Sequence, residues 1–251
     1  MKRKIDLPII TLDVDWAPDW MIDQAASDLR ISSVRATWFI THMSPAIQSL
    51  MQDPLFEIGL HPNFLAGSSH GDTPAAVLDH VRALAPQATA VRTHSLMQSE
   101  PLLELMATSY GMRVDCSLHL PLVGDLKPHR LRFGADSPWM TRLPHLFQDN
   151  MYMFLGRPWN LDNSWFQNPG LKIMDFHPIH VALNSSSMEE YEHLKKRGRL
   201  SDLRPTDIAP RDPAALGAGT LFRQVIASLR NSQSLTVSQC ATIWEQENEQ
   251  A

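Results

Sequence analysis

Residues 9–16 read IITLDVDW, a run of apolar and β-branched residues that ends in two acids one residue apart. This pattern is typical of a strand that is buried on both faces of a parallel sheet. Because residues i and i+2 of a strand point to the same side, Asp13 and Asp15 are expected to converge. Two carboxylates this close repel each other unless a cation or a shared proton lies between them. We therefore expect a functional site where this strand ends; the alternative is a solvated strand end with two incidental acids.

Strand-like and helix-like patterns then alternate along the chain, which is typical of βα units and a parallel sheet. Further strands are predicted at residues 36–41, 56–61, 90–94, 113–118, 139–143 and 171–177. Helices are predicted at residues 19–30, 45–51, 73–84, 100–110, 187–197 and 221–229. This succession favours a closed or nearly closed (β/α) barrel over an open doubly wound sheet. No glycine-rich phosphate fingerprint follows the first strand, which excludes the usual dinucleotide-binding fold.

Other parts of the chain lack so regular a pattern. Residues 121–168 are rich in proline, tryptophan and methionine and are expected to form long loops over the site. Ser187 and Glu190 have the spacing of a capping box at the start of the helix at 187–197. The acidic tail after Trp244 is expected to fray. Because no repeat or linker is evident, we predict that residues 1–251 form a single domain.

The composition excludes several functional classes. The chain of 251 residues is 43% hydrophobic and 20% charged, as in ordinary globular proteins. A net charge of −5, with no cluster of basic and aromatic residues, gives no support to nucleic-acid binding. The two cysteines, Cys116 and Cys240, imply no disulfide framework. There is no signal-peptide pattern and no apolar run that could span a bilayer, so we expect a cytoplasmic protein without a membrane span.

The predicted strands end in polar residues that could form one site. In parallel βα folds, functional groups gather at the carboxyl ends of the strands. The candidates at these positions are Asp13, Asp15, His61, Arg92, His94, Asp115 and His177. Acids and imidazoles gathered at the carboxyl ends of the strands, which form the mouth of the barrel, suit a divalent metal with nitrogen and oxygen ligands, such as zinc. Taken singly, each histidine is better interpreted as a hydrogen-bonded structural residue; it is their joint placement that favours a functional site.

Several motifs resemble one known family. Residues 11–15 (TLDVD) resemble the opening motif of the NodB-homology polysaccharide deacetylases, carbohydrate esterase family four. Residues 57–62 (EIGLHP), 91–94 (VRTH) and 173–177 (IMDFH) resemble the second, third and last motifs, and residues 114–117 (VDCS) the strand between. Together they cover about residues 8–182, in the expected order. Residues 57–64 and 92–95 are also similar to a divergent branch found in O-antigen biosynthesis, of the WbmS type.

The resemblance implies a distorted (β/α)7 barrel and metal-dependent removal of an acyl group, expected to be acetyl, from an amino sugar or sugar precursor in polysaccharide or O-antigen biosynthesis. By this resemblance Asp13 would be the general base and His177 the general acid. Arg92 would hold Asp13 in place, and Asp15 and His61 would bind the metal. Zinc is the expected ion, with nickel and cobalt as alternatives.

The chain departs from the family pattern at one ligand. The family usually has a second histidine four residues after the first, and here that position is Leu65. The third ligand must therefore be another residue or be absent. We favour His94, because a strand end positions a ligand at lower entropic cost than the loop that carries His70. His70 remains the alternative. Asp149 is a candidate to orient His177, although it could also be an acid on a surface loop.

Three other functions must be weighed. An apolar strand followed by Asp-x-Asp also opens the haloacid-dehalogenase-type phosphatases, but their motif requires threonine where Ala17 stands. Metal-dependent glycosyltransferases use Asp-x-Asp as well, normally deep in the chain. A non-enzymatic alternative is a sugar-binding protein that has lost its metal but kept the barrel, which Leu65 in place of a ligand would explain.

Overall fold

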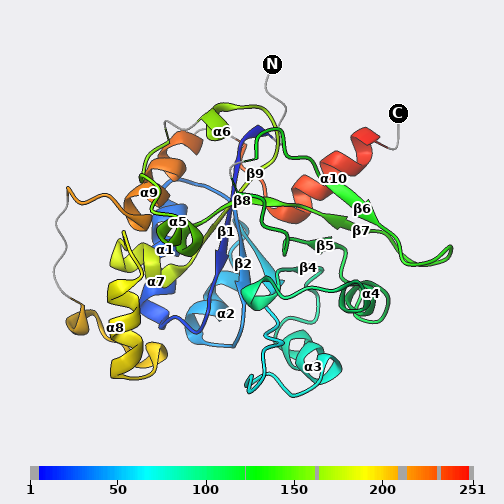
Figure 1. Ribbon diagram of the computed structural model, residues 1–251, viewed down its shortest axis with the longest axis horizontal. Coiled ribbons are helices and arrows are strands. Elements are labelled where there is room, and N and C mark those ends of the chain that lie inside the picture. Colours follow the sequence, from blue (N-terminus) through cyan, green and yellow to red (C-terminus); the bar gives the residue numbers. More distant parts are fainter. Residues whose placement is uncertain (1–5, 122, 162–163, 209–213, 231–232, 249–251) are drawn as a thin grey trace.

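The computed structural model describes residues 6–121, 123–161, 164–208, 214–230 and 233–248. At its centre is a nine-stranded sheet with the strand order β6-β7-β5-β4-β3-β2-β1-β9-β8 (Figure 1). The strands are β1 (Pro8–Asp13), β2 (Ala36–Ile40), β3 (Phe56–Leu60), β4 (Ala90–Val91), β5 (Val114–Asp115), β6 (His129–Leu131), β7 (Met140–Arg142), β8 (His145–Gln148) and β9 (Lys172–Phe176). Neighbouring strands pair in parallel except β6 and β7, which are antiparallel.

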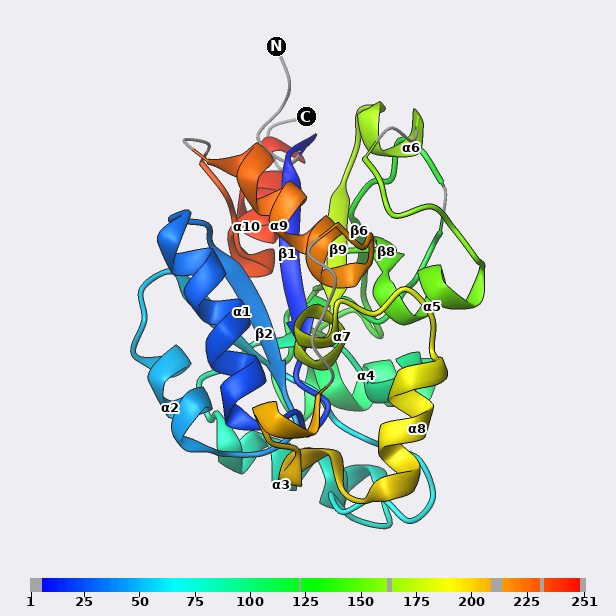
Figure 2. The same cartoon turned by 90° about the vertical axis from the view of Figure 1, so that its left-hand side faces the viewer.

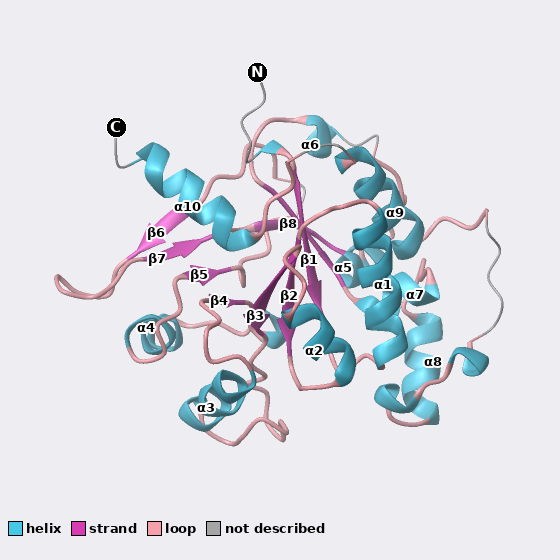
Figure 3. Ribbon diagram, turned by 180° about the vertical axis from the view of Figure 1, so that it is seen from behind, coloured by secondary structure: helices cyan, strands magenta, loops and turns pink. Residues whose placement is uncertain are grey.

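Helices lie around the outside of the sheet (Figure 3). They are α1 (Asp19–Ile31), α2 (Pro45–Met51), α3 (Pro74–Leu84), α4 (Glu100–Thr108), α5 (Asp149–Phe154), α6 (Ser164–Gln167), α7 (Pro178–Leu183), α8 (Glu189–Arg197), α9 (Ala218–Leu229) and α10 (Val237–Asn248). Short 3₁₀ turns are η2 (His94–Leu96), η3 (Leu200–Asp202) and η4 (Pro205–Asp207). Within the described residues, no helix combines the length and the hydropathy required to cross a bilayer.

Strand β1 is buried between two other strands, as its sequence predicts. All six of its residues are buried, and it pairs with β2 on one side and β9 on the other. Helix α1 covers it with buried residues spaced three or four apart, among them Ile22, Ala25 and Leu29. In Figure 2, helix α1 lies beside β1 and in front of β2. A strand with covered faces and two neighbours must be apolar until it reaches the edge of the sheet, and Asp13 is its last residue.

The sheet is curled, and hydrogen bonds cross between the segment after β5 and strand β8. The Leu120 N–H donates to the His145 carbonyl over 2.9 Å, and the His145 N–H donates to the Leu118 carbonyl over 2.9 Å. A single bridge pairs His119 with His145. The α/β class and the parallel sheet are therefore confirmed, and the curled sheet is consistent with the expected barrel.

The structure corrects three predictions. Residues 121–168 contain β7 as predicted, but also β6, β8 and α5 in place of long loops. The capping box is wrong: α8 begins at Glu189 after Met188, which makes no side-chain cap hydrogen bond. The fraying expected after Trp244 is wrong as far as Asn248, where α10 ends; residues 249–251 lie outside the described residues.

Candidate active site

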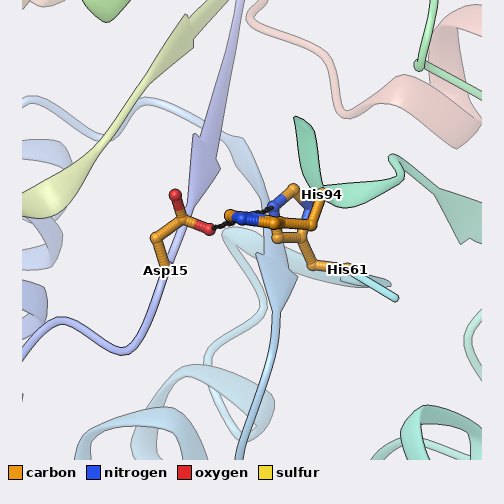
Figure 4. A group of neighbouring side chains, drawn as sticks. All are labelled: Asp15, His61 and His94. Atoms are coloured by element: carbon orange, nitrogen blue, oxygen red, sulfur yellow. Dashed lines mark hydrogen bonds and ion pairs between the residues drawn. The ribbon is translucent and has the colours of Figure 1, made fainter. Parts of the chain in front are cut away.

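Three side chains from separate βα units meet at the carboxyl ends of β1, β3 and β4. The Asp15 Oδ1 atom lies 2.8 Å from His94 Nδ1 and 3.2 Å from His61 Nε2. The two imidazole nitrogens are 3.4 Å apart. Figure 4 shows the three side chains pointing toward one another. We call Asp15, His61 and His94 the Asp15 group.

Asp15 lies in a turn after β1, and strand periodicity does not predict this backbone conformation. Strand β1 ends at Asp13, and Asp15 and Trp16 have φ angles of 44° and 57°. Residues other than glycine rarely occupy this left-handed region, and each costs of order 1–3 kcal/mol that the surroundings must offset. Even so, Asp13 and Asp15 both face His61 Nε2, at 3.8 Å and 3.2 Å. The predicted convergence is present, but Asp15 reaches it from a turn.

His94 is also placed differently from the prediction. Strand β4 ends at Val91, and His94 begins the 3₁₀ turn η2 instead of ending a strand. Its backbone N–H donates to the Pro62 carbonyl over 2.9 Å, which ties His94 to the residue after His61. This hydrogen bond links the segments that follow β3 and β4, and it holds His94 near His61.

The donor set of the Asp15 group fits a divalent metal. The Nδ1–H of His61 can donate to the Arg92 carbonyl 2.8 Å away, so the nitrogen that faces Asp15 is Nε2, which carries a proton in the metal-free site and would give it up to bind an ion. A hydrogen bond of this kind commonly fixes the tautomer of a metal-bound histidine. Burial would raise the pKa of Asp15, but the hydrogen bonds from His61 and His94 hold it well below its usual range. One carboxylate and two imidazoles within 4.8 Å of one another are a suitable set for zinc or a similar ion.

A second set of charges lies behind the Asp15 group. The Arg92 Nη1 atom is 2.9 Å from Asp13 Oδ1 and 2.7 Å from Asp175 Oδ1. Arg92 also donates to the Cys116 carbonyl and lies over the ring of Phe39. We call Asp13, Arg92 and Asp175 the Arg92 network; its side chains are 2%, 0% and 0% exposed. Burial opposes the charge of Arg92, but the two carboxylates raise its pKa further.

Asp175 is the functional candidate that sequence reasoning missed. It is an acid within the buried strand β9, two residues before His177, so both side chains lie on the same side of the strand. Atoms of Asp13, Asp175 and His177 lie within 4.8 Å of one another. Burial raises the pKa of Asp175 well above its usual range. The available signal was an acid placed between the apolar residues Met174 and Phe176 of a strand.

His177 is held by Asp149. The Nδ1 atom of His177 lies 2.6 Å from Asp149 Oδ1, and its backbone N–H donates to Asp149 Oδ2 over 2.7 Å. Asp149 is completely buried at the start of α5, so it is not a surface acid. Burial opposes the charge of His177, but Asp149 raises its pKa well above the usual value. The other ring nitrogen, Nε2, lies 3.5 Å from Asp15 Oδ2.

Two other candidates face different partners. Asp115 accepts hydrogen bonds from Arg142 Nε and the Ser117 N–H, at 2.7 Å and 3.1 Å. The ring nitrogens of His70 lie 3.1 Å from the Asn63 nitrogen and 2.9 Å from the Thr41 carbonyl. Both ring nitrogens of His70 are therefore hydrogen-bonded to backbone groups. The geometry thus favours His94 over His70 as the third ligand.

Comparison with known proteins identifies the family. Residues 10–195 match the family model described as WbmS-like polysaccharide deacetylase. A crystal structure of WbmS from Bordetella bronchiseptica, a candidate polysaccharide deacetylase involved in O-antigen biosynthesis, is 30% identical. The match covers 89% of this chain and 91% of that one, with a TM-score of 0.78.

A more distant structure shares the fold. The peptidoglycan deacetylase PdaC from Bacillus subtilis is 13% identical, with a TM-score of 0.51 over 98% of this chain and 94% of that one. No match was found among curated proteins. The family match covers most of the chain, and the WbmS structure is similar over nearly all of it. The chain belongs to the WbmS-like polysaccharide deacetylase family.

Proposed function

We propose that this protein is a metal-dependent deacetylase that hydrolyses the N-acyl group, most simply acetyl, of an amino sugar or sugar precursor in polysaccharide or O-antigen biosynthesis. The observation that carries the proposal is the meeting of Asp15, His61 and His94 beside Asp13 and His177. The similarity to WbmS, which is described as involved in O-antigen biosynthesis, supports the process. The curled sheet supports a distorted (β/α)7 barrel formed by a single domain of residues 1–251.

The Asp15 group would hold the metal, with zinc as the first candidate and nickel or cobalt as alternatives. When bound, such an ion polarises an amide carbonyl and makes water more acidic. The side chains of Asp15 and His94 are 17% and 20% exposed, so an ion can reach them from solvent. The buried Nε2 of His61 would complete the set from the inner side.

Asp13 is assigned as the general base. It would accept a proton from the water molecule whose oxygen forms the new bond to the acyl carbon. Arg92 holds one carboxylate oxygen of Asp13 at 2.9 Å. The other, Oδ2, is on the side of His61 and is left to take the proton. The guanidinium thus orients the base without occupying both of its oxygens.

His177 is assigned as the general acid. When the amide C–N bond breaks, the leaving nitrogen takes a proton, which Nε2 of His177 would supply. Asp149 fixes the ring through Nδ1 and keeps it charged. Since Asp13 gains one proton and His177 loses one, the net reaction is hydrolysis to an amine and a carboxylic acid.

The alternative is a sugar-binding protein on the same fold that has lost its metal, which Leu65 in place of the usual second histidine would favour. The Asp-x-Asp phosphatase has no support from the family comparison. The test is to incubate the zinc-loaded protein with N-acetylated amino sugars and nucleotide-linked amino sugars and to measure acetate and free amine. We expect equal amounts of both products, and none after chelation of the metal. Sugar binding without acetate release in every metal-loaded form would support the binding protein instead.

A further inference from the structure

We propose that His70 is a positioning residue that fixes the geometry of the Asp15 group without binding the metal. The inference rests on the proposed function, because it assigns His70 a role toward the proposed metal site. His70 is 4% exposed and lies in the loop after β3. Its contacts reach the segments that carry His61 and Asp15, and Trp16 links it to His94.

The first two contacts are hydrogen bonds from the ring to the backbone. His70 Nδ1 accepts the N–H of Asn63, two residues after His61, and Nε2–H donates to the carbonyl of Thr41 after β2. One acceptor and one donor are required at once, so the ring must be neutral with its proton on Nε2. Burial, with a further contribution from the neighbouring charge of His80, lowers the pKa of His70 to about 4, which fits this form.

The third contact runs through Trp16, the residue after Asp15. The Trp16 N–H donates to Thr41 Oγ over 3.3 Å, so the same residue anchors Trp16 and His70. The Trp16 ring lies 5.6 Å from the His70 ring and 5.5 Å from the His94 ring, between centroids. Trp16 is thereby packed between the histidine that we propose as a ligand and the one that we propose as its support.

The loop itself is fixed well enough for His70 to serve as a support. The Leu65 N–H donates to Asn63 Oδ1 over 3.0 Å, and the His70 N–H donates to Ser68 Oγ over 3.1 Å. The His70 ring also stacks on the exposed ring of His80, with 4.8 Å between the ring centroids and 16° between the ring planes. Hydrogen bonds and a stacked ring therefore hold the loop that carries His70.

These contacts explain why histidine is suited to position 70. Asp15 and Trp16 have strained positive φ angles, and such a conformation persists only where its surroundings hold it. His70 ties the segment behind Trp16 to the segment behind His61. Without it, Asp15 and His94 would lose a shared support, and the metal would meet a less ordered ligand set.

The test is cobalt binding by the full chain, measured from its visible absorption spectrum and by competition with a chelator. We expect His70→Leu to weaken cobalt binding about 10- to 100-fold and to change the absorption bands, as loss of supporting contacts does at other metal sites. His70→Gln should restore both, because its amide offers one acceptor and one donor. The matched control is His80→Leu, which removes the stacked ring but none of the hydrogen bonds, and should bind cobalt as the wild type does.

The outcomes separate this inference from the proposed function. Wild-type affinity and spectrum in a folded His70→Leu variant would overturn the role of His70 and leave the metal site intact. If His70→Leu does not fold, His70→Gln decides: binding close to wild type supports the role, and a loss above tenfold overturns it. A wild-type protein that binds no cobalt, zinc or nickel would overturn the proposed function as well.

Discussion

The Asp15 group and the Arg92 network lie side by side at the carboxyl ends of the strands, but their carboxylates are neutralised differently. The Arg92 network is fully buried and contains its own cation, which lies between two carboxylates. The Asp15 group is partly open to solvent, and its carboxylate faces two imidazoles with no permanent cation among its residues. A buried charge without a partner is costly, so the network must be complete on folding. The Asp15 group can instead be completed by an ion from solution.

The difference predicts that the two clusters respond differently to the loss of one member. Arg92→Met would leave Asp13 and Asp175 buried without their cation, and breaking such a pair costs about 3–5 kcal/mol. His94→Ala, in the metal-free protein, removes a partly exposed ring and should cost under about 1 kcal/mol. Urea denaturation of both variants with chelator present measures the two values. Equal losses would mean that the comparison is wrong.

The next effect concerns catalysis and leaves the metal in place. Asp13→Asn keeps an oxygen near Arg92 but removes the base, so we expect kcat to fall about 10²- to 10⁴-fold. Zinc content should remain as in the wild type, because Asp13 is outside the Asp15 group. Full activity in this variant would refute the assignment of Asp13 as base.

His177→Ala should give a similar separation of binding from turnover. The general acid is lost, and we expect a fall in kcat of about 10²-fold or more. Substrates with a better leaving group than an alkyl amine should be affected less, because they depend less on protonation. An unchanged kcat for the amide substrate would exclude His177 as the acid.

The smallest effect concerns the pH dependence. Asp149 raises the pKa of His177, so the charged ring persists to a pH above the ordinary histidine value and kcat should fall only when the pH rises through the raised pKa. Asp149→Asn removes the carboxylate, lowers the pKa of His177 and moves this alkaline fall to lower pH. The measurement is kcat against pH for both proteins at equal zinc content. An alkaline limb at the same pH in both would show that Asp149 does not act through His177.

Much of this fold is predictable, because local signals agree with tertiary structure. The helix Pro45–Met51 has its predicted bounds; proline occupies its first turn, and the structure adds that the Ser44 side chain caps it. Strand β1 was predicted from its apolar run, and its neighbour β2 from β-branched and aromatic residues. The polar residues at the strand ends follow from the parallel arrangement of the strands.

What could not be predicted depends on partners that are distant in the sequence. Strand β8 is four residues long, and it becomes a strand through its pairing with β9. Asp149 is buried because this strand delivers it to His177, 28 residues later. The ring of His70 is occupied by backbone groups of Thr41 and Asn63, which no pattern of side chains reveals. The turn at Asp15 requires positive φ angles, which the residue types aspartate and tryptophan do not predict.

The most direct test of the account is the metal content of the purified protein and of Asp15→Ala after equilibration with zinc. Asp15 gives the only carboxylate of the proposed ligand set, and its Oδ1 atom lies near both imidazoles. We predict close to one zinc ion per wild-type chain and essentially none in the variant, with both proteins folded. A wild-type chain that takes up no zinc, nickel or cobalt, or a variant that retains the full amount, would contradict the claim that Asp15, His61 and His94 grip one cation.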